Sequence, residues 1–229
     1  MSISVGPNDA TAGLVLYLDA ANNKSYPGSG TAWTDLSGNG NNSTLTNSPT
    51  YNSNGTFSLN GTTQYFYNAT PNLPSGNTPF TTSVWVYSNY KGTNSIHPNL
   101  ISWGSNSTGN KNGLALQTDV SGNAQILHWF FGNDNTWTIT DITNTWANVA
   151  VTYNGTSLTL YINGVIIGAV NPPSTPSVTG TTNLEIGNFT ASSTYAFNGN
   201  ISIVSVYNIA LTQSQIQQNF QAHRGRYGI

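Results

Sequence analysis

The sequence lacks cysteine and contains very few charged residues. Without cysteine the chain forms no disulfide and offers no thiolate nucleophile or thiolate metal ligand. Only five lysines and arginines and seven aspartates and glutamates occur among 229 residues, giving a net charge of −2. Nucleic-acid binding needs clustered basic side chains that neutralise phosphates, so the sequence predicts no nucleic-acid partner. The same shortage argues against attachment to an anionic membrane surface.

Long apolar segments are also missing. No apolar run approaches the roughly 20 residues that span a bilayer. The first 13 residues lack a basic region followed by an apolar run, so they predict no signal peptide. Asn, Thr, Ser and Gly instead make up more than a third of the chain. Eight Phe, twelve Tyr and six Trp lie on regular strand patterns, and this favours an ordered domain over a disordered one.

The clearest pattern lies in residues 146–170, which predict three antiparallel strands joined by two tight turns. Each turn contains an Asn-Gly dipeptide, at residues 154–155 and 163–164, and this dipeptide accepts the positive φ angles of a type I′ turn. The alternating pattern predicts that three apolar side chains of the first two strands are buried: Val151, Leu160 and Ile162. Residues 165–167 are apolar on both faces, so we expect the third strand deep in a sheet that is covered on both sides.

Short strand-like runs separated by Gly, Asn and Ser recur along the rest of the chain, as in an all-β sandwich or jelly roll. Near the C-terminus, Thr212 and Gln215 have the spacing of a helix capping box. We therefore expect one short helix near residues 213–222, ended by Gly225. The predicted organisation is an N-terminal arm at residues 1–12 that docks onto a neighbouring molecule, followed by a single domain at residues 13–229.

Several of these segments resemble a known family. The runs at residues 146–153 and 158–164 resemble the central signature of laminin G-like jelly rolls, which belong to the concanavalin A-like lectin and glucanase superfamily. The runs at residues 184–187, 197–201 and 206–211 are similar to the closing strands and helix entry of this family. The resemblance extends from about Gly13 to Gln221 and implies a jelly-roll sandwich of two antiparallel sheets. The opening, residues 13–42, resembles a subgroup common among tailed-phage structural proteins.

The resemblance and the residue types suggest two candidate sites. Family members often hold calcium at the end of the fold near residues 35–42, where four side chains offer oxygen ligands at alternating positions: Asp35, Ser37, Asn39 and Asn41. The alternative is an Asx-rich tight loop that satisfies its own backbone.

The second candidate site is aromatic. Five side chains fall on the strands and loops where a jelly roll builds a glycan-binding or subunit-contact face: Tyr90, Trp103, His128, Trp129 and Trp137. The alternative for these side chains is the core. Residues 126–131 are apolar on both faces, so we expect one side to pack in the sandwich and the other to line a groove or meet a neighbouring subunit.

Enzymatic activity is disfavoured because glycosidases of this superfamily use two closely spaced carboxylates. The chain has one glutamate, Glu185, and its aspartates are scattered near turns. We therefore expect a non-enzymatic virion surface protein, either capsid decoration or tail adhesin. It would act by contacts with other virion proteins, with its own copies (as a trimer) and with cell-surface glycan. The alternative function is a free-standing carbohydrate-binding lectin domain.

Overall fold

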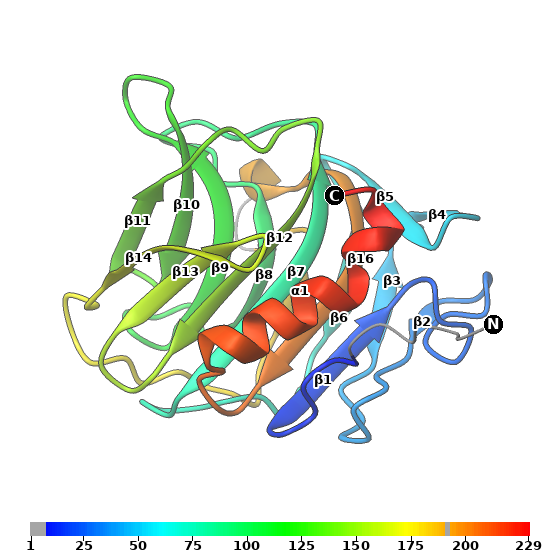
Figure 1. Ribbon diagram of the computed structural model, residues 1–229, viewed down its shortest axis with the longest axis horizontal. Coiled ribbons are helices and arrows are strands. Elements are labelled where there is room, and N and C mark those ends of the chain that lie inside the picture. The colour runs from blue at the N-terminus through cyan, green and yellow to red at the C-terminus, as the bar shows by residue number, and fades with distance from the viewer. Residues whose placement is uncertain (1–7, 191–192) are drawn as a thin grey trace.

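The computed structural model describes residues 8–190 and 193–229 and shows two antiparallel sheets packed face to face, as predicted (Figure 1). Sheet A contains β1(Leu14–Asp19), β4(Thr50–Asn52), β5(Thr56–Asn60), β7(Phe80–Ser88), β12(Trp146–Tyr153), β13(Leu158–Ile162), β14(Val165–Val170) and β16(Asn198–Tyr207). Sheet B contains β2(Ala32–Trp33), β3(Ser43–Thr46), β6(Tyr65–Asn68), β8(Asn99–Gly104), β9(Lys111–Thr118), β10(Ala124–Trp129), β11(Asp134–Thr138) and β15(Leu184–Ile186). The helical elements are a short 3-10 helix, η1(Ser193–Tyr195), and α1(Gln213–Tyr227).

The order of strands places sequence-distant segments side by side. Sheet A runs β14-β13-β12-β7-β16-β5-β4, with β1 also paired to β16, and sheet B runs β11-β10-β9-β8-β15-β6-β3-β2. The core lies between the sheets and takes alternate side chains of each strand, because successive side chains of a strand point to opposite faces. On β12, for example, Val149 and Val151 are fully buried in this core, while Ala150 between them packs in a second cluster with Leu211 and Ile216 at the start of α1.

The two Asn-Gly turns differ from each other. Asn163 and Gly164 both have positive φ (52° and 76°), as a type I′ turn requires. At the first turn only Gly155 has positive φ (96°), so the prediction of a second type I′ turn is wrong. The Asn154 side chain instead accepts hydrogen bonds from the backbone N–H groups of Thr156 and Ser157. The Asn154 amide therefore holds a wider loop.

The third strand of this unit is not central. β14 is the edge strand of sheet A, and its apolar side chains are exposed: Val165 by 61%, Ile166 by 44% and Ile167 by 41%. The expectation that residues 165–167 lie deep in a covered sheet is therefore wrong. Leu160 and Val151 are fully buried as predicted, whereas Ile162 is only half-buried, next to the exposed edge.

Helix α1 lies across the outer face of sheet A (Figure 1). The predicted capping box is present: the Thr212 hydroxyl accepts the Gln215 N–H, and the Gln215 side chain accepts the Thr212 N–H. The helix continues past the predicted end at Gly225 to Tyr227, and Gly228 caps it in the left-handed conformation. Tertiary contacts explain the extra turn, because Tyr227 stacks on Trp85 with ring centroids 4.2 Å apart.

The described part of the predicted arm packs on its own domain. Ala10 is buried and donates its N–H to the Asn219 side chain of α1, and the Asp9 carboxylate lies 2.8 Å from His223 Nε2. Residues 1–7 of the predicted arm lie outside the described residues. Asp9 and Ala10 thus contact their own domain, and docking of the arm onto a neighbouring molecule stays a prediction.

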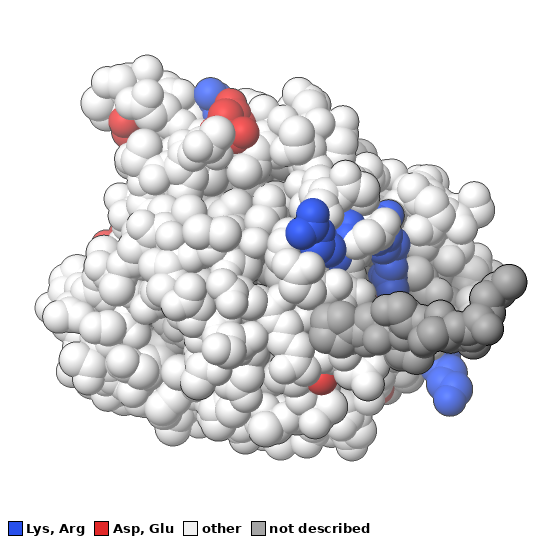
Figure 2. Space-filling model, viewed as in Figure 1, with Lys and Arg blue, Asp and Glu red and all other residues white. Residues whose placement is uncertain are grey.

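Charged side chains are sparse on the face that carries α1 (Figure 2). Within the described residues, no helix is long and apolar enough to cross a membrane.

Candidate functional site

Strand β10 presents different side chains to its two faces. His128 and Phe130 point into the core, whereas Leu127 and Trp129 point away from it and pack with Phe131 in a separate apolar cluster. This cluster lies on the outer face of sheet B, the opposite side of the molecule from α1. Residues 126–131 therefore have one side inside the sandwich and one side outside it, as predicted; the outer side was expected to line a groove or to meet a neighbouring subunit.

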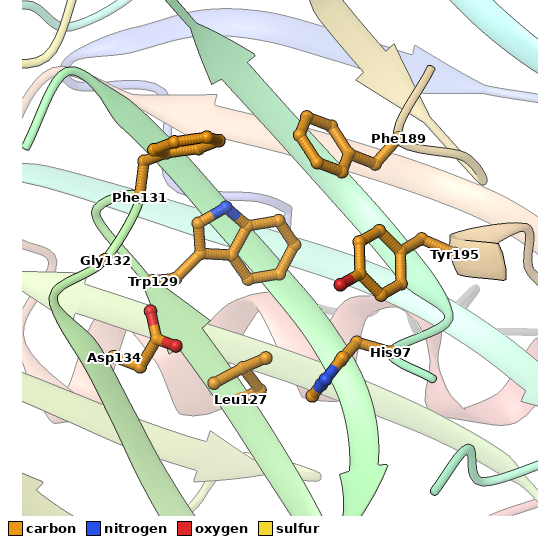
Figure 3. A pocket seen from close by; sticks show the side chains of 8 residues that line it. All are labelled: His97, Leu127, Trp129, Phe131, Gly132, Asp134, Phe189 and Tyr195. Carbon is orange, nitrogen blue, oxygen red and sulfur yellow. The ribbon is translucent and has the colours of Figure 1, made fainter. Parts of the chain in front are cut away.

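The outer cluster forms part of a pocket of about 160 Å³ (Figure 3). Its lining comes from β10 and the turn after it, from the start of β11, and from two loops that cross sheet B. The lining residues are His97, Leu127, Trp129, Phe131, Gly132, Asp134, Phe189 and Tyr195. Figure 3 shows their side chains arranged around the Trp129 indole.

The indole of Trp129 lies against the backbone of the neighbouring strand. Trp129 pairs with Gly113 of β9, and a Cβ atom built on Gly113 would lie 2.1 Å from Trp129 Cε2. No other residue type fits beneath the indole without displacing it. The missing side chain of Gly113 therefore lets the ring lie low over the sheet and leaves space above it.

Aromatic rings at steep angles surround this space. The Phe189 ring centroid lies 6.4 Å from that of Trp129 and 6.3 Å from that of Phe131, with interplanar angles of 59° and 71°. Tyr195 is nearly parallel to Phe189 at 5.7 Å, and His97 meets Tyr195 at 5.3 Å. The pocket wall is thus mostly apolar ring surface.

Two titratable groups lie among the rings. Partial desolvation raises the pKa of the Asp134 carboxyl, and a hydrogen bond from the Gly132 backbone opposes this rise. Desolvation lowers the pKa of His97, whose Nδ1 is buried without a hydrogen-bond partner. His97 is therefore neutral at neutral pH, and Asp134 is the one charged side chain among the lining residues.

A buried ion pair supports the Phe189 wall from behind. Lys111 Nζ lies 2.6 Å from Glu185 Oε2, and both side chains are almost completely inaccessible to solvent. The ammonium also lies 4.8 Å from the Phe189 ring centroid, and the other Glu185 oxygen accepts hydrogen bonds from the N–H and hydroxyl of Thr190. Burial lowers the pKa of Lys111, and Glu185 counters this effect. The Lys111–Glu185 pair therefore holds the loop residues Phe189 and Thr190 against sheet B.

The structure places the predicted aromatic residues in different environments. Trp129, itself only 8% exposed, lies on the pocket floor on the outer face of sheet B, whereas Trp103, His128 and Trp137 point between the two sheets. Those three cannot line a face open to a glycan, and their placement there was wrong. Tyr90 is exposed in the loop after β7 and does not line the pocket.

His128 occupies a polar position inside the core. Its Nε2 lies 2.8 Å from Asn112 Oδ1, and its ring lies parallel to Phe80. Complete burial lowers the pKa of His128 to about 3, so the ring stays neutral in the folded protein.

The sequence pattern predicted an outward side for residues 126–131 and identified Trp129, but it did not indicate the rest of the pocket wall. Alternation from Trp129 could have identified Leu127 and Phe131 as its same-face neighbours. Phe189, Tyr195 and His97 lie on loops, and no local pattern marks them. They reach the site because β8 and β15 are adjacent in sheet B.

The predicted calcium loop uses its oxygens internally. Asp35 Oδ1 accepts the N–H groups of Tyr17 and Ser37, and Oδ2 accepts the Ser37 hydroxyl and the Asn41 N–H. The Asn41 side-chain oxygen accepts the N–H of Asn72. These hydrogen bonds are those of an Asx-rich loop, and calcium binding by Asp35, Ser37, Asn39 and Asn41 stays a prediction. Among the described residues, no group of three or more His, Cys, Asp or Glu side chains is placed to hold a metal.

Comparison with known proteins defines the family. Residues 60–217 match the family model described as the concanavalin A-like lectin/glucanases superfamily, so the chain belongs to this superfamily. A search of curated protein sequences found no match.

Solved structures share the fold at low sequence identity. Domain 4 of an extracellular arabinanase from Geobacillus stearothermophilus, solved in complex with arabinotriose, is 21% identical with a TM-score of 0.69, covering 92% of this chain and 99% of that one. The binding domain of botulinum neurotoxin serotype D is 17% identical with a TM-score of 0.66, covering 93% and 52%. A heptameric pentraxin from Limulus polyphemus is 14% identical with a TM-score of 0.57, covering 71% and 79%. The chain thus spans nearly the whole arabinanase domain but about half of the neurotoxin domain.

Proposed function

We propose that this protein is a non-enzymatic binding module that takes a saccharide in the pocket on the outer face of sheet B. The observation that carries the proposal is the set of rings around Trp129, with Phe131, Phe189 and Tyr195 beside a single carboxylate. Sugars are bound by apolar stacking together with a few directed polar groups, and the pocket offers both. The arabinanase domain of similar fold, solved with arabinotriose, supports this reading.

The carboxylates of the chain support binding without cleavage. Glycoside hydrolysis in most families needs two carboxyl groups on either side of the scissile bond. The pocket lining contains Asp134 alone, and Glu185 is 1% exposed and committed to Lys111 and Thr190. We therefore expect no release of reducing ends when the protein is incubated with polysaccharides. Turnover that disappears in Asp134→Asn would overturn the non-enzymatic proposal.

A glycan array tests the binding proposal directly. Wild-type protein should bind a restricted set of glycans, and Phe131→Ala should reduce that binding at least tenfold because the variant removes a ring of the pocket wall. Tyr90→Ala is the matched control, since Tyr90 is an exposed aromatic residue outside the pocket. Equal loss in both variants, or no glycan bound by wild-type protein, would contradict a saccharide site here.

We also propose that the protein works as a virion surface component and assembles with its own copies, for which a trimer is the working hypothesis. The resemblance of residues 13–42 to tailed-phage structural proteins supports the location. The exposed apolar side chains of edge strand β14 support self-association, because exposed apolar patches and unpaired strand edges mark interaction sites. Sedimentation should show an oligomer that Val165→Lys dissociates. A monomer at all concentrations would contradict the assembly proposal.

A further inference from the structure

The charged side chains of the pocket lining are of one sign only, negative. Asp134 is at its rim, and no Lys or Arg is among the eight lining residues. Within residues 8–190 and 193–229, no basic side chain lies within ion-pair distance of the Asp134 carboxylate. Lys111, whose ammonium contacts the Phe189 ring of the pocket wall, is fully buried and paired with Glu185. The carboxylate of Asp134 is therefore not neutralised by the protein itself.

The aromatic rings, like the Asp134 carboxylate, favour a positively charged ligand. The face of an aromatic ring carries the negative part of its quadrupole and attracts cations, by about 0.5–2 kcal/mol per contact. Phe189 is already within 4.8 Å of the Lys111 ammonium, so a ring of this wall has a cation as neighbour. Trp129, Phe131 and Tyr195 have no Lys or Arg against them among the cation–ring contacts of the described residues. Three rings and a carboxylate thus face a space of about 160 Å³ without a counter-ion.

We propose that the pocket selects saccharides that carry a free ammonium group, as amino sugars do. This inference rests on the proposed saccharide-binding function and specifies its ligand class. The sugar ring packs on the aromatic wall, and its ammonium group lies between the rings and the Asp134 carboxylate. An acidic sugar would bring a second negative charge beside Asp134 and is rejected, because like charges repel each other at short distance.

Partial desolvation of Asp134 is consistent with this role. The surroundings that raise the Asp134 pKa also reduce the solvent screening of a charge placed beside it. Asp134 is itself solvent-exposed, so this reduction in screening is modest. His97 is neutral and adds no opposing positive charge at neutral pH.

Within each series, the amino, N-acetylamino and hydroxyl ligands of the test differ only at carbon 2 of each sugar. Isothermal titration calorimetry compares tetrasaccharides of glucosamine, N-acetylglucosamine and glucose with the same linkage, together with the corresponding galacto series and a uronic-acid tetramer. Wild-type protein should bind an amino tetramer about tenfold more tightly than the hydroxyl tetramer of the same series, and the uronic-acid tetramer should not bind. Tenfold corresponds to about 1.4 kcal/mol, within the range of cation–ring attraction.

Two variants separate the ammonium inference from the binding proposal. Asp134→Asn should reduce the amino preference, measured as the ratio of the affinities for the amino and hydroxyl tetramers, to less than about threefold. Asp141→Asn is the charge-matched control, because Asp141 pairs with Lys91 away from the pocket, and it should keep the preference. If wild-type protein binds neutral and amino tetramers equally, the ammonium inference is overturned while saccharide binding stands. If no tetramer binds and the glycan array is also empty, the saccharide function and this inference both fail.

Discussion

The carboxylate of Glu185 and the ammonium of Lys111 lie 2.6 Å apart, with side-chain exposures of 1% and 0%. Lys111→Met leaves Glu185 buried without its counter-ion, which costs about 3–5 kcal/mol of unfolding free energy. Urea denaturation followed by fluorescence measures the loss.

The double variant Lys111→Met with Glu185→Gln is the control for this pair. It removes both charges and keeps an acceptor oxygen for the Thr190 N–H. We expect it to be more stable than Lys111→Met alone, because the unpaired charge is gone. The loss of unfolding free energy in the double variant should be smaller than the sum of the losses in Lys111→Met and Glu185→Gln. A loss equal to that sum would contradict the coupling of the two charges.

His128 predicts a specific dependence of stability on pH. Its pKa is about 3 in the folded protein, compared with 6.5 for an unperturbed histidine. The unfolded chain therefore binds a proton on this residue at a higher pH than the folded protein. Its contribution to stability is complete above pH 6.5 and is lost as the pH falls from 6.5 towards 3, at up to about 1.4 kcal/mol per pH unit. Between pH 6 and 4, His128 contributes on the order of one proton to the slope of unfolding free energy against pH. This slope should therefore be smaller in His128→Gln. An identical slope in the variant would show that His128 does not titrate in this way.

The central hairpins provide a matched pair of core and edge substitutions. Leu160 is fully buried, so Leu160→Ala should reduce the unfolding free energy by about 2–5 kcal/mol. Val165 is 61% exposed on the edge strand, so Val165→Ala should change it by no more than about 0.5 kcal/mol. Thermal melts of both variants check the difference. Similar losses for the two would mean that β14 is covered in solution.

The Asp35 loop should depend on its hydrogen bonds. Asp35→Asn replaces one acceptor oxygen with an NH₂ donor. This donor would face N–H or O–H groups that now donate to the carboxylate. The substitution should therefore lower the unfolding free energy by about 1–3 kcal/mol. Because the oxygens are already used, millimolar calcium or a chelator should leave the melting temperature of the wild-type protein unchanged. A rise in melting temperature with calcium that Asp35→Asn abolishes would instead establish a metal site.

Local patterns predicted the features that depend on neighbouring residues. The capping box at Thr212 and the turn at residues 163–164 both formed as expected, because each needs only side chains within a few positions. The burial of β14 was wrong for a different reason. An apolar pattern shows which faces of a strand avoid polar residues, but the position of that strand in the sheet depends on pairings with distant segments. The end of α1 likewise depends on Trp85, more than a hundred residues away in sequence.

The pocket was mostly beyond sequence reasoning for the same physical reason. Trp129 could be proposed because it lies on an apolar strand, but one residue of register decides whether it or His128 faces outward. Phe189 and Tyr195 come from a loop between β15 and β16, and His97 comes from the loop before β8. The order of strands in sheet B brings these loops together, and no spacing along the chain encodes it.

The close contact between Gly113 and Trp129 means that the depth of the pocket is controlled from beneath. A methyl group at position 113 would lift the indole into the space above it, although residue 113 is not among the residues that line that space. Related proteins with alanine or serine at this position would therefore have a shallower pocket, even with every lining residue retained. Ligand preference in such relatives could change through a residue that no ligand touches.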